Sequence, residues 1–262
     1  MRQTMAINEI FPNPTVKQVI FQITFPNLFY LENRIGEIQE RIMKDFPKSK
    51  LLHRNTFRVK LGIGQAMEPL QEDPVSNSPE KLWQFESTTG TILNITTNSL
   101  DMSSASHKTY KLGNDDNKKF RYAIEQVVGT FIEVSKLPII NRIGLRYIDY
   151  CPVPVKDNKT FFEWYDSKFP VNQFQIADVE SMAFRAIVKK GKYTLGYVET
   201  LAQIKGEDKL ILDFDGTATD IRASDYLETT DILHEMISEE FERTTRADKG
   251  PLYDFMSRQP KR

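Results

Sequence analysis

The sequence predicts an α+β fold made of two pseudo-repeated halves, each a mainly antiparallel sheet packed by amphipathic helices. Three observations lead to this class. Segments with alternating apolar residues occur in runs, each run is followed by a segment with apolar residues three and four positions apart, and this order recurs in both halves of the chain. Runs of strands followed by helices are typical of α+β proteins, whereas parallel α/β folds alternate single strands with single helices.

The first expected strand covers residues 16–25, where apolar side chains occupy every second position. An amphipathic helix follows and ends at Pro47, because proline cannot continue a helix. The apolar side of the strand is formed by Val19, Phe21, Ile23 and Phe25, and that of the helix by Leu31, Ile35, Ile38, Ile42 and Phe46.

Three more strands are expected, over residues 56–64, 81–87 and 91–100. The second and third would form a pair around a tight turn at Thr89–Gly90. The segment 67–79 is rich in Pro, Asp, Glu and Ser, a composition that is typical of an exposed loop.

Residues 103–119 are polar and predict a solvated loop before a second amphipathic helix, which closes at Pro138. The apolar stripe of this helix is Phe120, Ala123, Ile124, Val127, Val128, Phe131 and Ile132. The central strand of the first half then covers 141–150, NRIGLRYIDY. Side chains of a strand alternate between its two faces. One face would carry Ile143, Leu145, Tyr147 and Asp149, and the other Arg142, Gly144, Arg146 and Ile148.

The second half begins after a proline-rich connector whose aromatic part, FFEWYDSKFP, is expected to cap the core or to form a sticky surface. Two alternating segments joined near Lys190–Gly191 and a third strand, KLILDFDGT, follow. The third strand is expected to place its leucines and Phe214 inward and to turn at Gly216. A last helix starts at about Leu227, with a basic, polar tail after it; its inward residues are Ile232, Leu233, Met236, Ile237 and Phe241.

The two halves resemble each other in the order of their elements. Phe57–Arg58 and Phe184–Arg185 each open three strands, a polar loop and an amphipathic helix. We interpret this order as a divergent internal duplication, although few residues are identical. The expected organisation is an N-terminal half over 1–151, a connector over 152–172 and a C-terminal half over 173–262.

Composition excludes several classes of protein. Hydrophobic residues make up 40% of the 262 residues and charged residues 27%, as in ordinary globular proteins. The N-terminus lacks the apolar region of a secretory signal, and no apolar run is long enough to span a bilayer. A single cysteine, Cys151, suits a reducing compartment and is expected to be a buried structural thiol. The protein is therefore expected to be soluble and cytoplasmic.

Neither the net charge nor the motifs of the sequence indicate a cofactor. A net charge of −1 argues against electrostatic binding of nucleic acid by the whole domain, but it does not exclude binding by a local basic patch. Neither a P-loop nor a G-x-G-x-x-G motif occurs. The histidines, His53, His107 and His234, are far apart and lack the spacing of zinc ligands, so they are expected at the surface or the edge of the core.

The segment LILDFDGTATD matches the D-x-D-G-T nucleophile motif of haloacid dehalogenase-like phosphatases. In that chemistry Asp213 would attack phosphorus and Asp215 would act as acid and base, with Mg²⁺ neutralising the phosphate. The match covers about ten residues and comes too late in the chain, because such domains begin with the motif and continue with a long parallel α/β unit. We therefore expect a strand that places both aspartates on one face.

Arg142 and Arg146 have two interpretations. In the first, they form a structural ion-pair network with Asp213, Asp215 or Glu199, because a buried arginine must be paired. In the second, Gly144 lets a phosphate or carboxylate approach the two guanidinium groups. The first is favoured, since buried charges are paired more often than they are functional.

Around NRIGLRYIDY the chain resembles an uncharacterised bacterial family of about this length with a sporadic distribution. The shared motifs are P-x-V, W-x-F-x-S, L-x-[IL]-T, R-I-G-L-R-Y-[IV]-[ND], L-x-L-D-[FI]-D and L-H-x-x-I-x-x-x-F. They correspond to residues 14–16, 83–87, 93–96, 142–149, 210–215 and 233–241. The chain departs from the family at Asp149, where Asn is common, and lacks an aromatic-rich segment after Tyr110. The resemblance implies the organisation of the chain and carries no activity; the patchy distribution suggests mobile accessory genes, including anti-phage and toxin–antitoxin modules.

Three functions follow from these observations. The first hypothesis is a non-enzymatic binding or regulatory subunit of a bacterial accessory system, which acts through contacts with a protein partner encoded by a neighbouring gene. The second is an anion- or nucleotide-sensing module, for which the candidate ligand-binding residues are Arg142, Arg146, Tyr147, Asp213 and Asp215. The third is a Mg²⁺-dependent phosphatase that uses Asp213 and Asp215. No catalytic residues are assigned under the first two.

Overall fold

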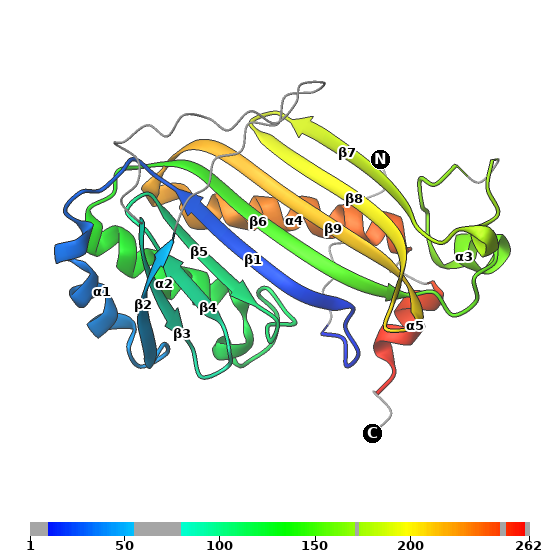
Figure 1. Cartoon of the computed structure of the whole chain (residues 1–262), viewed down its shortest axis with the longest axis horizontal. Coiled ribbons are helices and arrows are strands. Elements are labelled where there is room, and N and C mark those ends of the chain that lie inside the picture. Colours follow the sequence, from blue (N-terminus) through cyan, green and yellow to red (C-terminus); the bar gives the residue numbers. More distant parts are fainter. Residues whose placement is uncertain (1–9, 55–79, 171–172, 247–249, 260–262) are drawn as a thin grey trace.

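The structure is a computed structural model that describes residues 10–54, 80–170, 173–246 and 250–259. It is an α+β fold built on one nine-stranded antiparallel sheet in the order β2-β3-β4-β5-β1-β6-β9-β8-β7 (Figure 1). The strands are β1 (Val16–Thr24), β2 (Lys48–Arg54), β3 (Glu80–Glu86), β4 (Ile92–Ile95), β5 (Ser99–Ser104), β6 (Ile139–Pro152), β7 (Met182–Lys190), β8 (Tyr193–Ile204) and β9 (Glu207–Arg222).

The described residues form five helices, and α4 runs behind the sheet in the view of Figure 1. The helices are α1 (Ile35–Ile42), α2 (Phe120–Ser135), α3 (Asn158–Trp164), α4 (Tyr226–Thr245) and α5 (Pro251–Ser257). Helices α1 and α2 pack on each other at one end of the sheet, and α4 packs along β6, β9 and β8. We call the side with α1, α2 and α4 the helix-covered face and the opposite side the open face.

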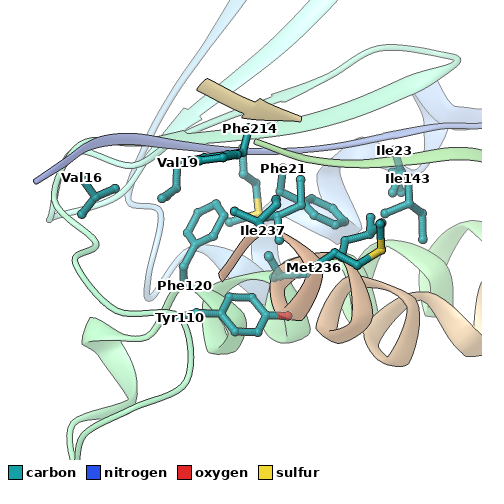
Figure 2. Close-up of a cluster of buried hydrophobic side chains, with 14 of the residues drawn as sticks. Val16, Val19, Phe21, Ile23, Tyr110, Phe120, Ile143, Phe214, Met236 and Ile237 are labelled. Atoms are coloured by element: carbon teal, nitrogen blue, oxygen red, sulfur yellow. The ribbon is translucent and has the colours of Figure 1, made fainter. Parts of the chain in front are cut away.

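The core fills the space between the sheet and these helices. The alternation in β1 buries Val19, Phe21 and Ile23 as predicted, while the intervening residues are partly or fully exposed. Figure 2 shows side chains of β1 and β9 meeting those of α2 and α4, among them Phe120 and Ile237. The apolar stripe predicted for residues 120–132 is confirmed, because α2 turns it toward the sheet.

Several elements differ from the sequence-based expectation. Residues 48–54 form the edge strand β2, and the segment expected as one strand over 91–100 splits into β4 and β5. β2 lacked the signal of a strand because its leucines, Leu51 and Leu52, are largely exposed and face no core. The strand expected over 56–64 and the loop over 67–79 lie outside the described residues.

The C-terminal half also departs from expectation at two points. The turn predicted at Gly216 is wrong, because β9 continues through it to Arg222. The polar tail contains α5, which starts with a proline at its first position and buries Leu252 and Met256. This helix holds the N-terminal arm: Asn13 donates from its backbone N–H to the carbonyl of Met256 at 3.0 Å and from its side chain to that of Phe255 at 3.4 Å.

The aromatic connector caps the core and contains α3. Phe161, Tyr165 and Phe169 are buried there. The segment also supplies donors to Glu199, which is fully buried on the helix-covered face and accepts hydrogen bonds from the Ser167 hydroxyl, the Lys168 backbone N–H and a nearby tyrosine. Glu199 is therefore no partner of the arginines on the opposite face.

The two expected halves share a single sheet. β6, assigned to the first half, pairs with β1 on one side and with β9 of the second half on the other. Register pairs of β6 and β9 extend from Ile139↔Arg222 to Pro152↔Lys209. Strands that were assigned to different halves are thus paired at the centre of the sheet. None of the helices in the described part of the chain is both long and apolar enough to cross a bilayer.

Candidate functional site

Four of the five site residues predicted from the sequence lie together on the open face. β6 presents Arg142 and Arg146, and the neighbouring β9 presents Asp213 and Asp215. The antiparallel register places Arg146 directly opposite Asp215 and diagonal to Asp213. The fifth residue, Tyr147, points to the helix-covered face, as the alternation of a strand requires.

Arg146 and Asp213 form a two-pronged ion pair across β6 and β9. The guanidinium Nε donates to Oδ1 at 2.7 Å and Nη2 donates to Oδ2 at 2.5 Å. Both oxygens of Asp213 are therefore occupied by one arginine. The side chain of Arg146 remains 44% exposed, so solvent screens the pair and limits its contribution to stability.

Arg142 is held differently. Its Nη1 donates to Gln22 Oε1 on β1 at 3.0 Å, and its Nη2 lies 3.6 Å from Asp215 Oδ2. The guanidinium lies over Gly144, where a Cβ would come within 2.9 Å of Nη1. The open space at Gly144, which the sequence suggested for an anion, thus accommodates a side chain of the protein itself.

A shallow cavity of about 510 Å³ lies over these residues and extends to β7. We call it the arginine groove. It adds a third arginine, Arg185, which is exposed and has no ion pair or hydrogen bond through its side chain with any described residue. Among the described residues of the groove, three arginines face two aspartates, so one positive charge has no partner there.

Asp215 is the less constrained carboxylate of the groove. Burial raises the pKa of its carboxyl above the usual value, and Arg142 and Arg146 partly oppose this effect. Asp215 forms no hydrogen bond with a described side chain, and Arg142 lies 3.6 Å away, so its oxygens can accept a further hydrogen bond. Among the described residues, the groove therefore has one cation and one carboxylate that are not hydrogen-bonded through their side chains.

The arrangement gives little support to the phosphatase interpretation. Asp213, the expected nucleophile, is bound through both oxygens, and the strand runs straight through Gly216 where that motif needs a loop. In the described part of the chain, no group of three or more His, Cys, Asp or Glu side chains is arranged to hold a metal ion.

Tyr147 lines a second cavity, of about 160 Å³, on the helix-covered face. We call it the Asp149 pocket. It lies between the N-terminal arm, the loop at Lys108–Leu112, β6, α4 and α5. Tyr147 and Asp149 enter it from the same face of β6. The Tyr147 hydroxyl is buried and has no hydrogen-bond partner among the described residues.

The polar groups of the pocket are perturbed by burial. Asp149 accepts a hydrogen bond from Thr15 Oγ1 at 2.8 Å, and burial raises the pKa of its carboxyl to about 6 despite this bond and the nearby Lys108. His234 stacks on Tyr110 with ring centroids 4.0 Å apart, and burial lowers its pKa to about 3. The Asp149 carboxyl therefore loses its proton only near pH 6, and the His234 imidazole is neutral at pH 7.

Sequence reasoning missed most of this pocket. Asp149 was placed correctly on the apolar face of β6, where an acidic residue among Ile143, Leu145 and Tyr147 is itself a signal, since buried carboxylates are rare. His234 had no such signal, because its partners come from a distant loop. Arg185 was also missed, although it lies in an alternating strand.

Comparison with known proteins adds no assignment. No protein-family model matches the chain, and no curated protein sequence matches it at a significant level.

Proposed function

We propose that the protein is a non-enzymatic binding module that contacts a protein partner through β7 and the adjoining arginine groove. The observation that carries this proposal is the outer edge of β7, with which no strand pairs among the described residues. Ile187 is 66% exposed and Val188 42% exposed on this nine-residue strand. An unpaired edge that carries exposed apolar side chains is a template for another strand.

Charge indicates which partner suits this edge. Arg185, Lys189 and Lys190 are exposed on β7, and Lys192 follows in the turn. An extended segment with acidic side chains at alternate positions would add backbone hydrogen bonds along β7 and place carboxylates near Arg185. The proposed partner is therefore a protein with an acidic, extended segment.

The test is co-expression with the products of neighbouring genes, followed by affinity capture and size-exclusion chromatography. The expected result is a stable complex that is lost on Ile187→Asp and Arg185→Glu. The matched control is Lys44→Glu, which makes the same change of charge as Arg185→Glu at an exposed position after α1 and should leave the complex intact. Equal capture of all variants would refute the proposal, as would a wild-type protein that stays alone.

A second candidate function is anion or nucleotide sensing in the arginine groove. The unpaired Arg185 supports it, because Arg142 and Arg146 are already engaged. A phosphate would then raise the melting temperature of the wild type, and Arg185→Gln would abolish the shift while Arg146→Ala reduces it. Nucleotides and inorganic phosphate at several salt concentrations are suitable probes.

The phosphatase remains a third and weaker proposal. It requires Mg²⁺-dependent hydrolysis of a phosphate ester that disappears in Asp213→Asn. Equal activity in that variant, or none in the wild type, would remove it.

The biological setting is proposed from the resemblance and from Cys151. The sporadic bacterial family suggests an accessory system, with anti-phage defence and toxin–antitoxin modules as examples. Cys151 is a free, buried thiol, and this suits a cytoplasmic protein.

The internal duplication is also retained as a proposal. From β1 to α2 the chain forms a strand, a helix, strands and a helix, and from β6 to α4 it does so again. The sheet order places the two series on opposite sides of the β1–β6 boundary, with β3-β4-β5 mirrored by β7-β8-β9. This division would assign β6 to the second unit, where the sequence placed it in the first.

A further inference from the structure

The Asp149 pocket has an apolar body and one polar end. Its walls include Val16, Ile237, Phe241 and Met256, together with the stacked Tyr110–His234 pair. Its volume of about 160 Å³ is close to that of an apolar cavity of ~150 Å³ that holds benzene in another protein. The space therefore suits a compact molecule with about one ring.

The polar end consists of the Asp149 carboxylate and the Tyr147 hydroxyl. Asp149 has one oxygen bonded to Thr15, and it forms no ion pair with a described residue. The Tyr147 hydroxyl, two residues earlier on the same face, is buried without a hydrogen bond in the described part of the chain. Buried polar groups of this kind cost free energy unless a bound molecule or water satisfies them.

The inner end of the pocket offers hydrogen-bond acceptors, which suit a donor such as a protonated amine. Lys108 also lines the pocket and lowers the pKa of Asp149, and its Nζ donates to the Val16 carbonyl at 2.9 Å. Lys17 lowers the pKa of Asp149 as well, and Lys111 and Glu235 are exposed. His234 stays neutral because it is buried. Asp149 is thus the carboxylate of the inner end, and one of its oxygens forms no hydrogen bond with a described residue.

We propose that the Asp149 pocket binds a compact organic cation, with an apolar body of about one ring and a protonated amine. The amine would donate to the second oxygen of Asp149, which forms no hydrogen bond with a described residue, and to the buried hydroxyl oxygen of Tyr147. The ring would lie against Ile237 and Phe241 and beside the Tyr110–His234 stack. The site lies on the face opposite the arginine groove and is independent of partner binding through β7.

Benzylamine is a probe of this size and charge, and benzyl alcohol and benzoate are matched controls with the same ring. Binding is measured by isothermal titration calorimetry and by NMR chemical-shift changes on the full chain at pH 7.5. We expect saturable binding of benzylamine that is about tenfold or more tighter than that of either control, since a hydrogen bond to a charged group is worth this factor. Failure of the wild type to bind benzylamine, or equal binding of benzoate, would overturn the proposal.

Asp149→Asn should lower the affinity for benzylamine by about tenfold and leave that for benzyl alcohol unchanged. Tyr147→Phe should lower the affinity for benzylamine by a smaller factor. Asp215→Asn removes a carboxylate from the open face and should have no effect. Unchanged affinity in Asp149→Asn would contradict the assignment. If that variant does not fold, the pH dependence of binding to the wild type is the test. The affinity for benzylamine should rise between pH 5 and pH 7, because Asp149 ionises in this range. An affinity that does not change with pH would exclude the site.

Discussion

The guanidinium of Arg142 lies over the backbone of Gly144, and a Cβ at Gly144 would be 2.9 Å from Arg142 Nη1. Arg142 of β6 can therefore reach Gln22 on the neighbouring strand β1 only because residue 144 has no side chain. The glycine in R-I-G-L-R is explained by this contact within the protein. The following predictions start from this relationship.

Gly144→Ala should destabilise the protein by about 1 kcal/mol, because the displaced Arg142 loses its hydrogen bond to Gln22. The same change in an Arg142→Ala background should be neutral or slightly stabilising, since alanine is the better strand residue. Urea denaturation of the four proteins gives the coupling free energy. A coupling near zero would show that the two residues are independent.

Gly216→Val should cost about 2 kcal/mol, because β9 and α4 are in close contact there. A Cβ at Gly216 would lie 3.3 Å from Leu233 Cβ and 3.4 Å from Ile237 Cδ1. Gly196→Val on the open face is the matched control: its nearest atoms, Cβ and the carbonyl oxygen of Asp215, are 3.6 Å away. The control should change the free energy of unfolding by about 0.5 kcal/mol or less. Similar costs at both positions would contradict the packing of α4.

Asp149→Asn should stabilise the protein at pH 7.5 by about 2 kcal/mol more than at pH 4. The pKa of Asp149 is about 6 when folded and 3.8 as a reference value, so the folded state holds the proton more tightly. Its contribution to stability is complete below pH 3.8 and is lost as the pH rises through 6. Urea denaturation across this range, compared between variant and wild type, measures the difference; parallel pH profiles would refute it.

His234→Phe should make the protein less sensitive to acid. The pKa of His234 falls from 6.5 to about 3 on folding, so the unfolded state takes up the proton first. The wild type should lose about 2 kcal/mol through this group between pH 7 and pH 5. Phenylalanine keeps the ring beside Tyr110 and removes the titration. Melting temperatures at the two pH values should therefore differ less in the variant, and an unchanged difference would be inconsistent with a buried neutral histidine.

These two pH effects oppose each other. Asp149 stabilises the fold as the pH falls from 6 to 4, whereas His234 destabilises it from 6.5 downward. The single variants are therefore more informative than the wild-type profile, in which the two contributions partly cancel.

The sequence was sufficient where a pattern depends on neighbours along the chain. The alternation in β1 and β6 and the stripes of α2 and α4 were predicted because each faces one continuous core. The sequence also predicted that Arg142 and Arg146 lie on one face of β6 and Tyr147 and Asp149 on the other, since side chains alternate along a strand.

It was insufficient where the partner lies far away in the chain. β2 carries no buried face, and α5 is short and defined by its contact with Asn13. Gly216 suggested a turn, because the helix that packs against it comes from another part of the sequence. The Asp149 pocket combines five segments, and no local pattern records how they meet.

The hydrogen bonds from Asn13 to Met256 and Phe255 have a consequence for biosynthesis. The residues that line the Asp149 pocket extend from Phe11 to Met256, so a ribosome must translate the chain through residue 256 before the pocket can close. The strands of the sheet are made earlier and can pair while α5 is still inside the exit tunnel. A nonsense codon between residues 246 and 251 would give a chain that keeps all nine described strands and α4 but lacks this wall. Occupancy of the pocket would then distinguish chains that contain α5 from chains that lack it.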